Sequence, residues 1–299
     1  MIKRKSEKVS IIIPTFSRND TLDRAIKSAL GQTYQNIEII IVDDNPPNSE
    51  YRKSTEHLME KYSVNPKVRY CKNESNLGGA GARNNGIMVA VGDYIAFLDD
   101  DDEYYPQNIE KKLNTFLIEN NDKLAIVYGH CEYINHGRVV YRDCMFYKGN
   151  CLYEAMQMNC IVKTSQWMAK KEALLKVGLF SLVPSMQDSQ LLLKMLSVGY
   201  EITYVPEILS KYYMDFDQYS HITTNKRKVL EGELLYQIEC RKLYDRLNEE
   251  QIVNVEYVFA KTLYEQYKSL QDIANASLEK ERMYELCPKK AMYYFLNKY

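Results

Sequence analysis

The chain has 299 residues, which is enough for one large domain or two of modest size. Hydrophobic residues make up 45% and charged residues 26%, as in ordinary soluble globular proteins, and the net charge of −1 gives no global field that would favour nucleic acid. No apolar stretch approaches the roughly 20 residues of a membrane span, and no signal-type apolar core follows the basic residues 1–5. Seven cysteines without C-x-x-C spacing fit reduced thiols, so we expect a cytoplasmic protein.

The first 125 residues alternate between segments typical of buried strands and segments typical of amphipathic helices. In chain order they are a strand over 9–13, a helix over 22–30, a strand over 37–42, a helix over 50–62, a weaker strand over 67–71, a glycine-rich entry into a helix at 76–86, and a strand over 94–98. This alternation predicts an α/β fold with a mostly parallel central sheet flanked by helices. Ligands of such sheets bind at the carboxyl ends of the strands.

Four consecutive aspartates, Asp99 to Asp102, directly follow the apolar strand at 94–98, and we call them the acidic cluster. Carboxylates held side by side repel one another, so this cluster requires a compensating cation. Hard divalent ions prefer oxygen ligands and often share them with substrate phosphates. The pattern therefore indicates a metal-assisted enzyme with a phosphorylated donor. The alternative is a solvated acidic loop, in which Asp102 caps a helix that starts near Pro106.

The second half of the chain has a mixed pattern and then becomes helical. Strands are expected at 125–128 and 139–141 around a turn at 136–137, a helix at 187–198, strands at 200–204 and 208–212, and helices from about 225 onwards. We therefore predict a catalytic domain over 1–222, with a nucleotide-binding half at about 1–125 and an acceptor-side half at 126–222. A helical C-terminal extension is predicted over 223–299.

Several of these segments together resemble family-2 glycosyltransferases, which have the GT-A fold. The matching segments are residues 9–15 (VSIIIPT), 41–44 (IVDD), 76–78 (NLG), 82–84 (ARN) and 97–101 (FLDDD). They occur in the family's order and spacing within about residues 9 to 213. Each motif alone is a weak signal, but the set is specific.

The resemblance implies a donor site at the strand ends. Pro14, Thr15 and Phe16 would border the nucleotide base, Asp44 would accept a hydrogen bond from uracil, and Arg83 would lie near the donor phosphates. The alternatives are a plain strand-to-helix turn for the first three, a turn before Pro46 for Asp44, and a surface ion pair for Arg83.

The acidic cluster matches the D-x-D motif of the family. By this resemblance Asp101 would bind Mn²⁺ or Mg²⁺, and Asp99 would contact the donor ribose or support the metal. Asp100 is assigned to donor binding with Asp99. The family often adds a histidine after the last strand of the domain, a place for which His221 and Asp215 are the candidates here; a plain exposed loop is the alternative.

Asp188 occupies the position of the family's catalytic carboxylate, which implies a general base that takes the proton from an acceptor hydroxyl. Direct displacement of the leaving group would invert the anomeric configuration. Gln187 stands where the family usually has an acid, so Asp188 lacks a like-charged neighbour. Gln187 and Trp167 are assigned to the acceptor region, with helix capping the alternative for Asp188 and core packing the alternative for Trp167.

The resemblance implies transfer of a sugar from a nucleotide diphosphate, with UDP the expected nucleotide, to a glycan or lipid-linked glycan in cell-surface polysaccharide synthesis. Nucleic acid is not an expected partner. The rival functions are a nucleotidyltransferase that makes the sugar nucleotide and a non-catalytic module that binds it. Lys289, Lys290 and Lys298 lie among aromatic residues of the last stretch, which suits peripheral contact with the inner face of a membrane; a packing or homodimer element is the alternative.

Overall fold

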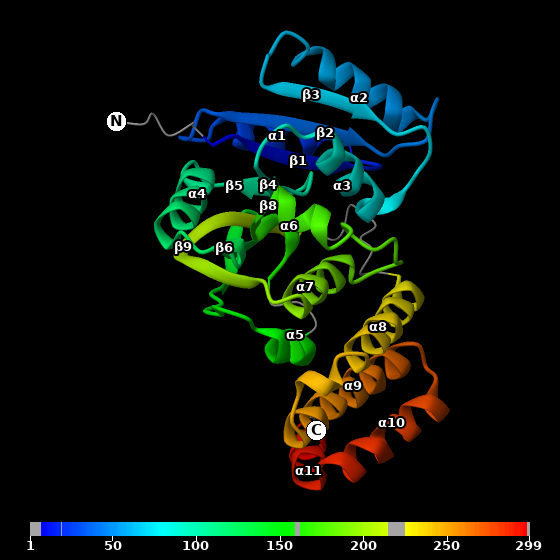
Figure 1. Ribbon diagram of the computed structural model, residues 1–299. Coiled ribbons are helices and arrows are strands. Elements are labelled where there is room, and N and C mark those ends of the chain that lie inside the picture. The colour runs from blue at the N-terminus through cyan, green and yellow to red at the C-terminus, as the bar shows by residue number, and fades with distance from the viewer. Residues whose placement is uncertain (1–6, 19, 159–161, 215–224, 298–299) are drawn as a thin grey trace. The chain divides into compact units, whose positions relative to one another are not determined.

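The computed structural model describes residues 7–18, 20–158, 162–214 and 225–297 (Figure 1). Contacts divide the chain into two compact units. The first is drawn from the ranges 1–150, 162–182 and 198–219, and the second from 151–161, 183–197 and 220–299. Two internal segments therefore pack with the C-terminal helices, an arrangement that the sequence patterns did not predict. The division predicted near residue 222 stays a prediction.

The first unit contains one mixed sheet. Its strands are β1 (Val9–Thr15), β2 (Ile37–Asp43), β3 (Val68–Lys72), β4 (Tyr94–Phe97), β5 (Glu103–Tyr104), β6 (Leu124–Asn135), β7 (Arg138–Asp143), β8 (Trp167–Lys170) and β9 (Glu201–Tyr213). Within the described residues their order is β3-β2-β1-β4-β8-β6-β9-β5, and β7 pairs with β6. Strands β1 to β4 pair in parallel, as do β6 and β9, whereas β8 is antiparallel to both of its neighbours. The predicted mostly parallel α/β sheet is confirmed.

Helices cover both faces of this sheet. The helices of the first unit are α1 (Leu22–Leu30), α2 (Glu50–Glu60), α3 (Gly78–Val89), α4 (Asn108–Glu119) and α6 (Lys171–Lys176). Alternate residues of β1 point to opposite faces. Ile11 and Ile13 join a core with Ile26 of α1 and Ile109 of α4. On the opposite face Ile12 meets α3.

Close packing of α3 against the sheet depends on a glycine. A Cβ added at Gly86 would lie 2.6 Å from Cγ2 of Ile12, a distance that real Cβ atoms do not tolerate. Gly86 therefore lets the helix backbone approach β1 closely. This contact holds α3, which carries Arg83, beside the carboxyl ends of β1 and β2.

The second unit is helical. Its helices are α5 (Leu152–Met158), α7 (Gln187–Ser197), α8 (Lys226–Arg241), α9 (Glu249–Ser269), α10 (Ile273–Leu286) and α11 (Pro288–Leu296). Residues from α9, α10 and α11, among them Ala260, Met283 and Ala291, share a buried core. Across the described residues, none of the helices combines the length and apolarity that a bilayer crossing demands.

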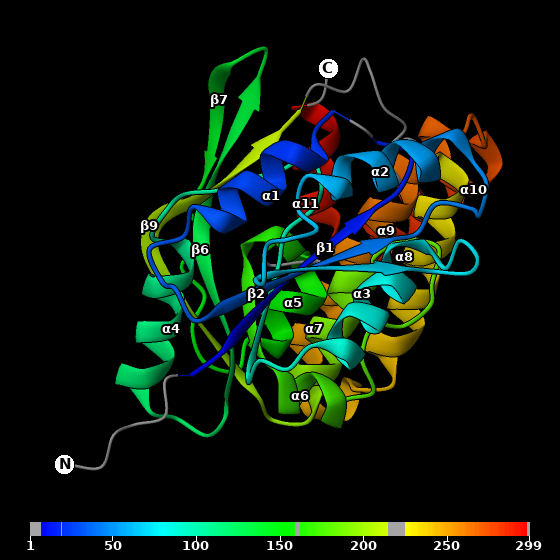
Figure 2. The ribbon, with the colours of Figure 1, turned by 90° about the horizontal axis from the view of Figure 1, so that it is seen from above.

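Several boundaries refine the sequence-based expectations. The turn predicted at 136–137 does connect β6 to β7, and Figure 2 shows this hairpin extending beyond the other strands of the sheet. The two strands predicted between 200 and 212 are one long strand, β9. The N-cap position of helix α4 is Gln107, and both carboxylate oxygens of Asp102 are without a hydrogen-bond partner, so the alternative role of Asp102 as its cap is wrong.

Candidate functional site

The predicted site residues of the first unit come from the carboxyl ends of three adjacent strands. Thr15 ends β1 and pairs with Asp43, the last residue of β2. The backbone N–H of Asp44 then donates to the carbonyl of Thr15 at 2.9 Å. The acidic cluster begins two residues after β4, which pairs with the other side of β1. Pairing of the strands thus brings segments that are far apart in sequence to one edge of the sheet.

Asp44 is buried and its carboxylate is fully engaged. Oδ1 accepts hydrogen bonds from Asn73 Nδ2 at 2.8 Å and from the backbone N–H of Leu77 at 2.9 Å. Oδ2 accepts from Asn76 Nδ2 at 3.0 Å and from the backbone N–H of Gly78 at 2.8 Å. A carboxylate has about four acceptor positions, and all are used here. Asp44 therefore holds the loop that leads into α3, and a contact with uracil requires that one of these donors leave.

Arg52, a buried residue of α2, contacts the carboxyl end of β2. Its side chain is 7% exposed and forms an ion pair with Asp43, with 3.1 Å between Nε and Oδ2. Its Nη2 donates to the carbonyls of Asp43, Asn45 and Asn73. Asn45 Nδ2 donates in turn to Asp43 Oδ1 at 2.8 Å. We call Asp43, Asp44, Asn45, Arg52 and Asn73 the β2 network.

Arginines accompany three members of the acidic cluster. Nη1 of Arg18 lies 2.7 Å from Asp100 Oδ1 and 2.6 Å from Asp101 Oδ2. Nη2 of Arg83 lies 2.5 Å from Asp99 Oδ1, and the Arg83 guanidinium lies 5.8 Å from the centre of the Phe180 ring. Two arginines of the chain itself therefore supply part of the compensating positive charge that the four carboxylates require.

The carboxylates of the cluster differ in their electrostatic surroundings. Burial raises the pKa of Asp100 to about 6, although Arg18 opposes this shift. Burial, together with the charges of Asp101 and Asp99, raises the pKa of Asp102 well above its ordinary value. Burial also acts to raise the pKa of Asp99, but Arg83 outweighs it and holds that pKa below its ordinary value. A pKa difference between adjacent carboxyls shows that they do not share one environment.

The donor chemistry of the cluster suits a hard divalent cation. Oδ2 of Asp100 and both carboxylate oxygens of Asp102 are buried without a hydrogen-bond partner. Carboxylate oxygens are the ligands that Mg²⁺ and Mn²⁺ prefer. Within the described part of the chain no three His, Cys, Asp or Glu residues are grouped to hold a metal by themselves. Because Mg²⁺ is commonly held by one or two carboxylates plus substrate phosphates, the cluster still fits such an ion.

Other predicted residues belong to the second unit, to the core of the first unit, or to the part of the chain that is not described. Asp188 and Gln187 belong to α7 of the second unit, where Asp188 is half-buried and Gln187 is buried. Trp167 is fully buried in β8, and its Nε1 donates to the carbonyl of Val162 at 3.0 Å. Core packing, the alternative given above for Trp167, is what the structure shows, and the acceptor contact is corrected, because the ring has no exposed face. Asp215 and His221 lie outside the described residues.

Sequence reasoning identified Arg83 but missed two other arginines at this edge, Arg18 and Arg52. Arg18 lies two residues after Phe16, and four carboxylates in a row require nearby positive charge, so it could have been proposed from position alone. Arg52 had no such signal, because it lies within an amphipathic helix and its partners come from two separate segments, the end of β2 and the residue after β3. Pro14 is half-buried and Phe16 is 46% exposed, so the Phe16 ring is open to a ligand.

Comparisons with known proteins agree with this geometry. A family model described as "Glycosyl transferase family 2" matches residues 10–178. An uncharacterized glycosyltransferase of Haemophilus influenzae is 32% identical over 191 residues, which cover 63% of this chain and 62% of that protein. A relative from Escherichia coli, named UDP-Glc:alpha-D-GlcNAc-diphosphoundecaprenol beta-1,3-glucosyltransferase WfgD, is 33% identical over 132 residues, 44% of this chain and 49% of its own length. The chain therefore spans less than two thirds of the length of these relatives.

Solved structures show the same fold. The crystal structure of S. aureus TarS 1–349 in complex with UDP-GlcNAc superposes with a TM-score of 0.68 at 16% identity, and the match covers 95% of this chain and 82% of that one. At this identity the likeness establishes the fold alone. The predicted GT-A fold and the predicted family are both confirmed, because the family model spans more than half of the chain. The chain belongs to glycosyl transferase family 2.

Proposed function

We propose that this protein transfers a sugar from a UDP-sugar to a hydroxyl of a glycan acceptor in cell-surface polysaccharide synthesis, with inversion at the anomeric carbon. The observation that carries the proposal is the pairing of Arg83 with Asp99 beside the Arg18 pair at the carboxyl edge of the sheet. Guanidinium groups suit phosphate oxygens, and carboxylates suit a divalent cation. The names of the E. coli relative and of the TarS complex support a UDP-linked donor and, for the relative, a lipid-linked acceptor.

Binding of the donor is assigned to three groups of residues in the first unit. The exposed ring of Phe16, with Pro14 and Thr15, borders the base. Asp44 shapes the base site through the loop that it holds, and contacts uracil by exchanging one of the loop's hydrogen bonds for the uracil N–H. Arg83 exchanges its contact with Asp99 for the donor phosphates, while Asp99 and Asp100 bind the ribose side of the donor.

Asp101, with Asp99, would hold Mn²⁺ or Mg²⁺. When bound, such an ion supplies Lewis-acid stabilisation of the departing diphosphate. Arg18 keeps Asp101 in place by pairing with it and with Asp100. Asp188 acts as the general base, since a carboxylate can take the proton of an acceptor hydroxyl as that oxygen attacks. Gln187, a neutral neighbour, leaves Asp188 without a second negative charge next to it.

The test is a screen of nucleotide sugars in Mn²⁺, in Mg²⁺ and with EDTA, with released nucleotide measured by chromatography. We expect release of UDP from at least one UDP-sugar, and only with the metal. Arg83→Met should lower this release at least tenfold, whereas Arg69→Met, which changes an exposed arginine of β3, should not. Release of pyrophosphate would instead show a nucleotidyltransferase. Binding of UDP without turnover of any donor or acceptor would show a non-catalytic module.

A further inference from the structure

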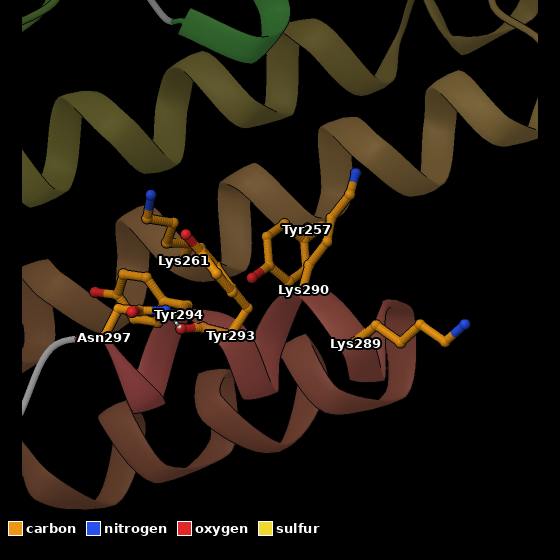
Figure 3. A pocket seen from close by; sticks show the side chains of 7 residues that line it. All are labelled: Tyr257, Lys261, Lys289, Lys290, Tyr293, Tyr294 and Asn297. Carbon is orange, nitrogen blue, oxygen red and sulfur yellow. Dashed lines mark hydrogen bonds between the residues drawn. The ribbon is translucent and has the colours of Figure 1, made fainter.

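A cationic pocket lies between α9 and α11 in the second unit, and it shares no residue with the proposed donor site. It encloses about 570 Å³ and is lined by three lysines (Lys261, Lys289 and Lys290), three tyrosines and Asn297 (Figure 3). None of the seven lining residues is acidic. The pocket therefore has the composition of a site for an anion that also contacts aromatic rings.

The lysines lie along tyrosine rings. Nζ of Lys261 is 5.0 Å from the centre of the Tyr294 ring, and Nζ of Lys290 is 5.8 Å from that of Tyr257. Figure 3 shows Lys289 extending away from the other two lysines. Long side chains of this kind cover apolar surface with their stems and keep the charge at the rim. The arrangement presents ammonium groups to the outside instead of burying them against acids.

Helix α11 carries its positive charge at the end that the helix dipole disfavours. Lys289 and Lys290 lie in its first turn, directly after Pro288, and no basic residue lies in its last turn. The N-terminus of a helix is already the positive end, because its first N–H groups have no partner within the helix. Two lysines there are unfavourable for the isolated helix. They become favourable when a negatively charged partner lies against this end.

The same helix exposes apolar side chains beside these charges. Met292 is 55% exposed, Tyr293 72% and Leu296 71%. Helical spacing places all three on one face with Lys289, whereas Ala291 is buried on the opposite side and packs into the core with α9 and α10. An exposed apolar face flanked by lysines is typical of a helix that lies on a membrane surface. A soluble anion would use the lysines but not this apolar face.

We propose that α11, with the cationic pocket, binds the surface of a bilayer that contains anionic lipids. The phosphates of the lipids contact Lys261, Lys289 and Lys290, and the side chains of Met292 and Leu296 enter the interfacial layer. The inference is independent of the proposed sugar transfer, since none of these residues takes part in the donor site. It concerns an association with one leaflet and not a span.

The experiment is sedimentation of the 299-residue chain with vesicles of phosphatidylcholine alone or mixed with phosphatidylglycerol. We expect binding to the mixed vesicles, weakened by salt. The triple variant Lys261→Gln/Lys289→Gln/Lys290→Gln should bind them on the order of 100-fold more weakly, because each lysine is expected to contribute roughly fivefold to the affinity. Met292→Ser/Leu296→Ser should also weaken binding, because it removes the apolar contact. The matched control Arg227→Gln/Lys228→Gln/Lys242→Gln removes the same charge from exposed positions of α8 and its C-terminal end and should bind within about twofold of wild type.

Three outcomes would overturn the proposal. The first is unchanged vesicle binding by the triple lysine variant. The second is full competition by inorganic pyrophosphate with no effect of Met292→Ser/Leu296→Ser, which would show a site for a soluble anion. The third is absence of vesicle binding together with a dimer in sedimentation analysis that the same double variant dissociates, which would show a contact between copies. Release of UDP, measured in parallel without vesicles, should be the same in every variant. A failure of the membrane proposal therefore changes vesicle binding only, whereas a failure of the proposed transfer appears as absence of UDP release.

Discussion

At the end of β2 the carboxylate of Asp44 accepts four hydrogen bonds, whereas after β4 three carboxylate oxygens of Asp100 and Asp102 accept none. Both regions lie at the same edge of the sheet and both are acidic. In the β2 network, neutral amides and backbone N–H groups satisfy Asp44, and Arg52 pairs with Asp43. In the acidic cluster, two arginines offset part of the charge and leave acceptor positions open.

This difference indicates that the β2 network is a structural region, whereas the acidic cluster has acceptor positions available to a ligand. A buried acid with every acceptor position filled is stable without a partner, even though burial raises the pKa of Asp44. Buried oxygens without donors carry a cost that a cation or a polar ligand removes. We therefore expect substitutions in the β2 network to act on folding and substitutions in the acidic cluster to act on binding. Four changes test or extend this comparison of the β2 network with the acidic cluster, and they follow in order of expected effect.

Asp188→Asn should leave both regions intact and remove the proposed base. Transfer should fall about 10²- to 10⁴-fold, as when a general base is lost, while affinity for UDP is unchanged. Transfer is measured with a donor found in the screen, and UDP affinity by calorimetry. Asp245→Asn, an exposed change in the same unit, serves as the control and should have no effect. Near-normal transfer by Asp188→Asn would refute this role.

Arg52→Met should break the β2 network. The free energy of unfolding should fall by about 3–5 kcal/mol, because Asp43 loses its buried ion pair and three carbonyls lose their donor. Urea denaturation measures the change. Arg69→Met, at an exposed position, should stay within about 0.5 kcal/mol of wild type. Equal stability of the two variants would mean that the network does not hold this strand end together.

Asp101→Ala should act on binding and not on folding. In Mn²⁺ the affinity for UDP should fall about 100-fold or more, and EDTA should lower wild-type affinity in the same way. Arg18 retains Asp100 as a partner in the variant, so the denaturation midpoint should move little. Unchanged UDP affinity in Mn²⁺ would count against Asp101 as the metal ligand and would reduce the contrast between the two regions.

Lys112→Met tests whether another buried polar group without a partner is costly. Lys112 is fully buried on α4, its Nζ has no hydrogen-bond partner, and burial lowers its pKa from 10.5 to about 7. Between these values the unfolded chain binds the additional proton, so wild-type stability should rise with pH by up to about 1.4 kcal/mol per unit.

The Tyr104 ring, whose centre lies 5.2 Å from this amine, and the Cys131 thiol, which acts on its pKa, are unchanged in the variant. The variant should therefore be more stable than wild type near pH 7, and the difference should shrink towards about pH 10. Denaturation at both ends of this range measures it. A stability difference that stays constant with pH would show that Lys112 keeps its proton when the chain folds.

Much of the donor edge could be predicted because its signals are local. Apolar runs that end at Pro14, Asp43 and Asp99 indicate parallel strands. In such a sheet the carboxyl ends of the strands lie at one edge, where ligands bind. The full engagement of Asp44 was not predictable, because it depends on side chains and backbone groups from distant segments. Asn73, Asn76 and Leu77 reach Asp44 only after β3 pairs with β2.

The sequence by itself determined the order of strands and helices as far as β4, the family and the place of the acidic cluster, because these follow from hydrophobic period and motif spacing within short windows. The tertiary structure decided which charges are balanced, by Arg18, Arg52 and Arg83, and which oxygens remain open. It also decided that the lysines of α9 and α11 share one pocket with an exposed apolar face beside it. Pairing across long separations is set by packing of the whole chain, and no local pattern encodes it.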